Sequence, residues 1–199
     1  MGLQDDKRLK ETDFANTAKL LNCSVAAIKA VADVESSGDG FLSDGRVKCL
    51  FEGHIFYRYT KGKYATSNPA ICYQKWTTNF YTKGKTADIR GNGELTRLAQ
   101  AMALDKTAAL MSASYGKFQI MGFNFTLCGF TSVDDFYQKM QVNEAMHLNA
   151  FCSYVQHVGL DDELRDMRWA DFARKYNGPE YQKNQYDVKL ANAYKKYAV

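Results

Sequence analysis

One helix pattern constrains this chain more than any other feature, because it runs into an acidic residue. Ser24 is a favourable N-cap, and apolar residues at helical spacing follow it: Val25, Ile28, Val31 and Ala32. The same spacing leads to Glu35, after which Gly38 and Gly40 end the helix. Glu35 therefore stands where a core residue would be expected.

This position predicts unusual chemistry for the Glu35 carboxyl group. It faces the negative end of the helix dipole and emerges from an apolar stripe, and both effects disfavour the ionised form. An acid that is still protonated near neutral pH can donate a proton to a glycosidic oxygen. The alternative is an ordinary surface glutamate at a frayed helix end.

Two further carboxyl groups could act as a partner of Glu35. Asp44 precedes Gly45 in a strong hairpin-turn signal, and a hairpin folded over the helix end could bring it across a cleft from Glu35. Two carboxyl groups that flank a sugar bond are the usual equipment for glycoside hydrolysis. Asp44 could equally be a plain turn residue. Glu52 is the second candidate, with an ion pair to Arg46, Lys48 or Arg58 as its alternative role.

The remaining periodicity predicts a mainly α protein with a small β element. We expect a flexible N-terminal arm over residues 1–12 and one domain over 13–199. Within it, residues 41–51 form a β-hairpin, and a helical or mixed segment follows at 50–59. Residues 61–93 lose periodicity, alternate aromatic with polar residues, and form a loop-rich smaller lobe or flap. Helices are expected at 13–21, 24–35, 94–109, 132–140, 143–158, 169–176 and 184–197.

Charge and motif content remove several classes of function. The net charge of +4 fits either a solvated surface or attraction to a polyanion such as an anionic cell wall, but no dense basic run indicates nucleic acid. The three histidines form no HExxH motif, and no phosphate-binding glycine loop is present, so we expect neither a metal site nor a cofactor. We also expect no signal peptide and no stable membrane insertion.

Three blocks of sequence resemble a known family when they are taken together. AVADVESSGDGFLSDGRVKCLFEGHIFYR (30–58), SASYGKFQIMGFNF (112–125) and FARKYNGPEY (172–181) are similar to blocks of the phage and prophage N-acetylmuramidase endolysins. These belong to the wider lysozyme-like superfamily, with its Glu-Ser helix end, Gly-x-x-Gln block and Tyr-Asn-Gly element. The resemblance covers residues 13 to 198 and implies a helical bundle with a small β-hairpin and a substrate cleft between two lobes.

The resemblance implies roles for particular residues. Glu35 matches the general acid. Asp44 and Thr60 match the other two members of a Glu, Asp and Thr trio, in which the threonine hydroxyl would position a water. Gln119 and Ile120 would line the floor of the cleft, and Tyr176 and Asn177 would lie near the scissile sugar. Apart from the resemblance, we also expect Glu52 to bind substrate. Each later block also has a structural alternative: Tyr176-Asn177-Gly178-Pro179, for instance, is a good helix stop.

The expected function is cleavage of the β-1,4 bond between N-acetylmuramic acid and N-acetylglucosamine in the glycan strands of peptidoglycan. A lytic transglycosylase that forms 1,6-anhydro products is the nearest alternative, and Asp44 and Thr60 favour hydrolysis over it. A non-catalytic wall-binding or virion module and a chitinase-like specificity are further alternatives. We expect a monomer that accumulates in the host cytoplasm, depends on a holin for access to the wall, and acts in the periplasm.

Overall fold

The computed structural model describes residues 5–36 and 38–198. The helices are α1 (Glu11–Leu21), α2 (Val25–Glu35), α3 (Gly53–Thr60), α4 (Ala87–Leu104), α5 (Lys106–Met111), α6 (Val133–Met140), α7 (Glu144–His157), α8 (Asp161–Arg165), α9 (Trp169–Asn177) and α10 (Tyr186–Tyr197). The strands are β1 (Cys49–Phe51), β2 (Ala113–Tyr115) and β3 (Ile120–Met121), and short 3-10 helices are η1 (Asp5–Lys7), η2 (Gly122–Asn124) and η3 (Tyr181–Asn184). The prediction of a mainly α protein with a small β element is confirmed.

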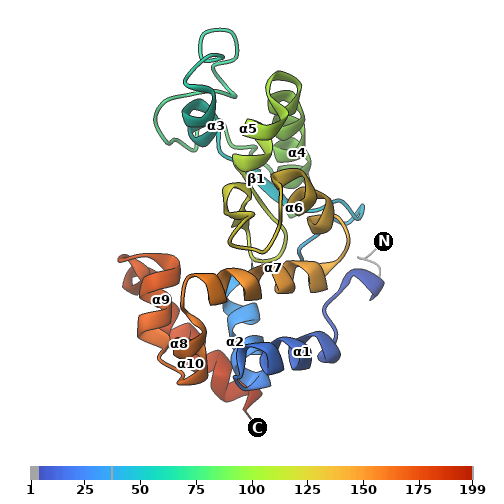
Figure 1. Cartoon of the computed structure of the whole chain (residues 1–199). Coiled ribbons are helices and arrows are strands. Elements are labelled where there is room, and N and C mark those ends of the chain that lie inside the picture. Colours follow the sequence, from blue (N-terminus) through green and yellow to red (C-terminus); the bar gives the residue numbers. More distant parts are fainter. Residues whose placement is uncertain (1–4, 37, 199) are drawn as a thin grey trace.

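Two lobes are visible in the arrangement of these elements (Figure 1). One lobe holds α3 to α6 and the sheet, and the other holds α1, α2 and α8 to α10, with α7 between them. Helix α10 packs along α2, and α1 packs against α2 from another side. Helix α2 is directed from its lobe toward the sheet, so its C-terminal residue Glu35 lies where the lobes meet.

Helix α2 forms as its sequence predicts. The Ser24 hydroxyl accepts a hydrogen bond from the Ala27 amide at 3.1 Å, which caps the helix. Its side chains are buried along most of its length: Ala26, Ala27, Ile28, Ala30, Val31 and Ala32. Because α10, α1 and α8 cover this helix, its last residue is held rigidly.

The sheet is antiparallel, in the order β1–β2–β3. Leu50 pairs with Ser114, and Ser114 pairs with Met121 on its other side. These three residues share one face of the sheet, because partners in register point to the same side. The sheet thus joins the segment after Glu35 to the segment that carries Gln119.

The predicted hairpin over 41–51 is present only in part. Phe41 and Val47 form one antiparallel bridge, and Gly45 at φ +83° makes the turn. The residues expected to extend it, Cys49 to Phe51, pair with β2 instead. The segment expected to be helical or mixed over 50–59 is mixed: Leu50 and Phe51 belong to β1, and α3 starts at Gly53.

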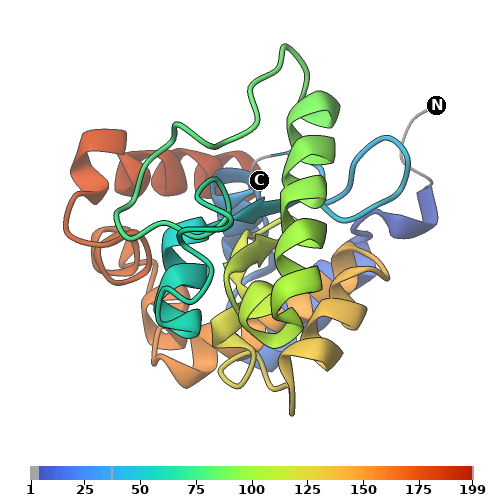
Figure 2. The ribbon, with the colours of Figure 1, turned by 90° about the horizontal axis from the view of Figure 1, so that it is seen from above.

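Several helix boundaries also differ from the prediction. Residues 61–86, called the flap below, contain no helix or strand among the described residues, and α4 begins at Ala87 rather than near Glu94 because Thr86 caps it (Figure 2). The helix expected over 94–109 is interrupted at Asp105, whose carboxylate caps α5 through the Ala108 amide at 2.9 Å. Helix α8 was not predicted.

The arm predicted over residues 1–12 makes specific contacts where it is described. The Lys7 ammonium donates to the Gly45 carbonyl at 2.8 Å, and the Leu9 amide donates to the Glu144 carboxylate at 3.2 Å. Helix α1 starts at Glu11 rather than Asp13, because the Asp13 carboxylate accepts from the Lys10 amide and closes the first turn. Residues 1–4 of the predicted arm lie outside the described residues.

In the described part of the chain, none of the helices combines the length and hydropathy needed to cross a bilayer.

Candidate active site

Glu35 lies at the C-terminal end of α2 and is only partly exposed. The side-chain amide of Asn177, the last residue of α9, donates to its Oε1 at 2.9 Å. Burial raises the pKa of Glu35 above its ordinary value, while the Asn177 hydrogen bond and the Lys189 charge act to lower it. Burial is the largest of these effects, so Glu35 keeps its proton to a higher pH than an exposed glutamate does.

A hollow of about 300 Å³ opens beside this carboxyl group. Its walls come from α2, the β2–β3 turn, α7 and α9, and the lining residues are Glu35, Phe118, Gln119, Ile120, Met121, Asn124, Tyr154, Tyr176 and Asn177. Four of the predicted binding residues, Gln119, Ile120, Tyr176 and Asn177, therefore surround Glu35. The pKa of Tyr176 is raised well above its usual value, chiefly by burial and then by the charge of Glu35, so its hydroxyl stays a neutral phenol.

Gln119 is held in a fixed conformation at the turn between β2 and β3. Its backbone has φ +47°, which a residue other than glycine adopts only at some cost. The Ser114 hydroxyl donates to its Oε1 at 2.8 Å, and its Nε2 donates to the Gly116 carbonyl at 2.8 Å. Because both ends of this amide are hydrogen-bonded, its place in the hollow is set by the turn.

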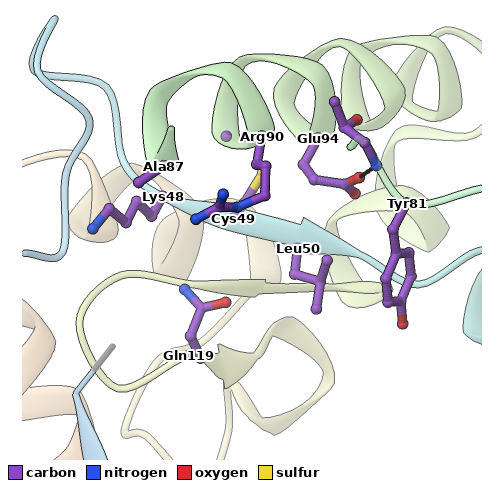
Figure 3. Close-up of a pocket in the computed structure, with 10 residues that line it drawn as sticks. Lys48, Cys49, Leu50, Tyr81, Ala87, Arg90, Glu94 and Gln119 are labelled. Atoms are coloured by element: carbon purple, nitrogen blue, oxygen red, sulfur yellow. Dashed lines mark hydrogen bonds between the residues drawn. The ribbon is translucent and has the colours of Figure 1, made fainter. Parts of the chain in front are cut away.

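A second hollow, of about 310 Å³, meets the first at Gln119. It runs between β1, α4 and the flap, and its lining residues are Lys48, Cys49, Leu50, Tyr81, Thr82, Ala87, Arg90, Gly91, Glu94 and Gln119 (Figure 3). Gln119 lines both hollows, and the two together are called the groove below, with Glu35 in one hollow and β1 along the other.

Glu52 directly follows β1 and is not among the residues that line the groove, but it contacts Tyr81, which is. It is two residues after Leu50 and so continues the same face of the strand. Its two carboxylate oxygens accept from the Tyr81 hydroxyl at 2.7 and 2.8 Å, and His54 Nδ1 lies 3.2 Å from Oε2. The partners of Glu52 are thus Tyr81 and His54, and not Arg46, Lys48 or Arg58, which the sequence offered as alternative ion-pair partners. The pKa of Tyr81 is raised, first by burial and then by the bond to Glu52, so the phenol remains the donor.

The structure does not bring Asp44 and Thr60 into the hollow of Glu35. Asp44 is exposed in the 41–47 turn, where Arg46 holds its carboxylate at 2.5 Å and lowers its pKa through hydrogen bonds. The Thr60 hydroxyl donates to the Phe56 carbonyl at 2.8 Å, within the last turn of α3. Neither residue is among those that line the groove.

Sequence analysis missed the buried pair Glu94 and Arg97, which anchors the flap. Glu94 is 4% exposed and accepts from the Thr82 amide at 2.7 Å, the Phe51 amide at 3.2 Å and Arg97 at 2.7 Å. Arg97 in turn donates to the Phe51 carbonyl at 3.1 Å. The pair therefore fastens the flap to β1 and α4, where it forms one wall of the groove. An acid and a base three residues apart on a helix look like a surface ion pair in the sequence.

His147 on α7 was also missed, and it joins the two segments that carry Glu35 and Gln119. A Cβ atom on Gly40 or Gly116 would lie 2.6 or 2.7 Å from its Nδ1, so only glycine fits at both places. The Lys117 amide donates to Nδ1 at 3.1 Å, and Nε2 lies 2.8 Å from the Met140 carbonyl. These partners require a neutral ring with its proton on Nε2, and burial lowers the pKa of His147 to about 4.

Folding stability should consequently fall in mild acid because of His147. Between the ordinary pKa of 6.5 and about 4, the unfolded chain binds a proton that the folded chain excludes. The free energy of unfolding should therefore decrease as pH falls through this window, by up to about 3 kcal/mol. Urea denaturation of the wild type and His147→Gln from pH 7 to 4 measures this, and the variant should show a smaller decrease. The exposed His157→Gln is the control and should follow the wild type; an equal pH dependence in His147→Gln would contradict the assignment.

Comparisons with known proteins agree with this geometry. A family model described as "Muramidase: N-acetylmuramidase" matches residues 24–198. Among solved structures, the crystal structure of a Burkholderia AP3 phage endolysin is similar to this chain. It has a TM-score of 0.86 and 38% sequence identity, over 98% of this chain and 72% of that chain. A comparison with functionally curated proteins finds no match.

Proposed function

The chain belongs to the N-acetylmuramidase family and is a glycoside hydrolase of peptidoglycan, and on that premise we propose which bond it cleaves and how. The proposed bond is the β-1,4 linkage between N-acetylmuramic acid and N-acetylglucosamine. Glu35 is the proposed general acid, and Gln119, Ile120, Tyr176 and Asn177 are the proposed contacts of the sugars on either side of that bond.

The raised pKa of Glu35, at the head of a groove, is the observation that carries this proposal. Oε1 accepts from Asn177, which leaves Oε2 to hold the proton. Donation of this proton to the bridging oxygen lets the leaving sugar depart as a neutral alcohol while positive charge develops on the other ring. Neutral amide and phenol groups around it suit sugar hydroxyls and N-acetyl groups.

Glu52 is our proposal for the second carboxylate, in place of Asp44. Glu52 follows β1 and is held by Tyr81, which lines the groove, whereas the Asp44 carboxylate is occupied by Arg46 in an exposed turn. A carboxylate beside the sugar could activate a water or stabilise the developing cation. The role predicted for Asp44 stays a prediction that the variants below test, and the role predicted for Thr60, to position the water, stays a prediction.

The biological setting that we propose is lysis of a bacterial host. The protein would act as a monomer, accumulate in the host cytoplasm, and reach the periplasm and the cell wall when a holin opens the inner membrane. This rests on the similarity to a phage endolysin.

Glu35→Gln should lower the rate of glycan cleavage by at least about 100-fold, because the amide cannot supply the proton. Release of reducing ends from purified sacculi measures the rate, and circular dichroism checks that the fold is intact. Glu11→Gln, an exposed glutamate on α1, is the matched control and should keep wild-type activity. Full activity in Glu35→Gln would contradict the proposal that Glu35 is the general acid.

Mass spectrometry of the same digests identifies the reaction. Hydrolysis consumes one water for each bond cleaved and leaves a free reducing end, whereas a lytic transglycosylase consumes none and leaves a 1,6-anhydro end. We expect hydrated products that carry N-acetylmuramic acid at the reducing end. Anhydro products would show that the enzyme is a lytic transglycosylase and not a hydrolase. Cleavage of chitin oligomers at a similar rate would indicate a chitinase-like specificity.

The two candidates for the second carboxylate are separated by matched amide substitutions. We expect Glu52→Gln to lower the cleavage rate at least about tenfold and Asp44→Asn to leave it within about twofold, because Glu52, unlike Asp44, is hydrogen-bonded to a residue that lines the groove. Initial rates on sacculi for both variants, each checked for folding, give the comparison. A larger loss of activity in Asp44→Asn than in Glu52→Gln would favour Asp44, as the sequence predicted, as the second catalytic carboxylate beside Glu35.

A further inference from the structure

A third hollow, of about 350 Å³, has a composition unlike that of the groove. Its lining residues are Ile55, Arg58, Tyr59 and Phe123. The first three lie at positions i, i+3 and i+4 of α3 and so share one face of that helix. Tyr59 is 44% exposed and Phe123 is 37% exposed, which is unusual for rings of this size beside a buried isoleucine.

Arg58 is the only charged residue of this lining, and it is exposed. Across residues 5–36 and 38–198, its guanidinium forms neither a salt bridge nor a hydrogen bond. Other arginines at the surface behave differently: Arg46, Arg165 and Arg174 each pair with an aspartate. The lining of the hollow therefore combines a positive charge that has no ion-pair partner within the described residues with two aromatic rings.

The hollow adjoins the Glu35 hollow through η2. Phe123 is the central residue of this short helix, and the next residue, Asn124, lines the hollow of Glu35. The two hollows are therefore lined by adjacent residues of one short helix. The third hollow shares no lining residue with the hollow that follows β1.

We propose that this third hollow binds the acidic peptide that branches from the glycan strand, through a carboxylate on Arg58. The inference rests on the proposed function, since muramic acid is the sugar that bears the peptide. A guanidinium matches a carboxylate in a two-pronged hydrogen-bonded pair, and the faces of Tyr59 and Phe123 suit the aliphatic parts of a short peptide. An uncharged sugar ring would leave Arg58 without a partner, so the charge favours the peptide.

Two forms of one substrate test this inference. Soluble, uncrosslinked glycan strands are used with their peptides intact and after an amidase has removed the peptides. Arg58→Gln should lower the ratio of the cleavage rates, peptide-bearing over stripped, about tenfold at limiting substrate, because it loses a charged hydrogen bond to the peptide. Arg58→Lys should retain part of the ratio. Lys139→Gln removes the same charge from an exposed position on α6 and should leave the ratio unchanged.

The outcomes separate failure of this inference from failure of the proposed function. An equal loss on both substrates in Arg58→Gln would mean that the hollow holds the sugar or its lactyl group, whose carboxylate the amidase exposes, and unchanged rates on both would mean that it holds no part of the substrate. Either result overturns the peptide site while the glycosidase proposal stands. If the wild type cut neither form of the strand, both proposals would fall together.

Discussion

The burial of helix α2 is the constraint on which the rest of the site depends. Its side chains are packed under α10 and α1, so the helix cannot turn its final residue out into bulk water. Partial desolvation then penalises the charged form of Glu35, while Asn177 and Lys189 favour that form. Because the penalty is the largest of these effects, Glu35 keeps its proton to a higher pH than a glutamate in water does.

Two buried polar clusters keep the groove in place around this acid. His147 and the glycines that contact it join the segment after α2 to the turn that carries Gln119. Glu94 and Arg97 join the flap to β1, and Tyr81 of the flap reaches the carboxylate of Glu52. Hydrogen bonds within each cluster satisfy the Glu94 carboxylate and both ring nitrogens of His147, which reduces the free-energy cost of burying them; within the described residues, Arg97 Nε has no partner. The geometry of the site is therefore supported from α7 on one side and α4 on the other.

The sequence predicted those parts of the structure that depend on residues close together in the chain. The cap at Ser24, the stripe of α2 and its end at Glu35 follow from spacing alone, and family resemblance placed Gln119, Ile120, Tyr176 and Asn177 in one region. The pairing of residues 49–51 with 113–115 could not be predicted, because it joins segments more than sixty residues apart. That pairing directs β1 away from the 41–47 turn and leaves Asp44 outside the groove. Glu94 and His147 were missed because burial by distant segments has no helical periodicity of its own.

The protonation of Glu35 is the central claim, and it can be measured directly in the wild-type protein. Selective ¹³C labelling of glutamate and NMR titration of the side-chain carboxyl signals give the pKa, with Glu35→Gln to assign the resonance. A midpoint clearly above the ordinary value of 4.5 is expected, because burial outweighs the Asn177 and Lys189 contributions. A midpoint at or below that value would contradict the account, since Glu35 would then have no more tendency to hold a proton than a glutamate in water.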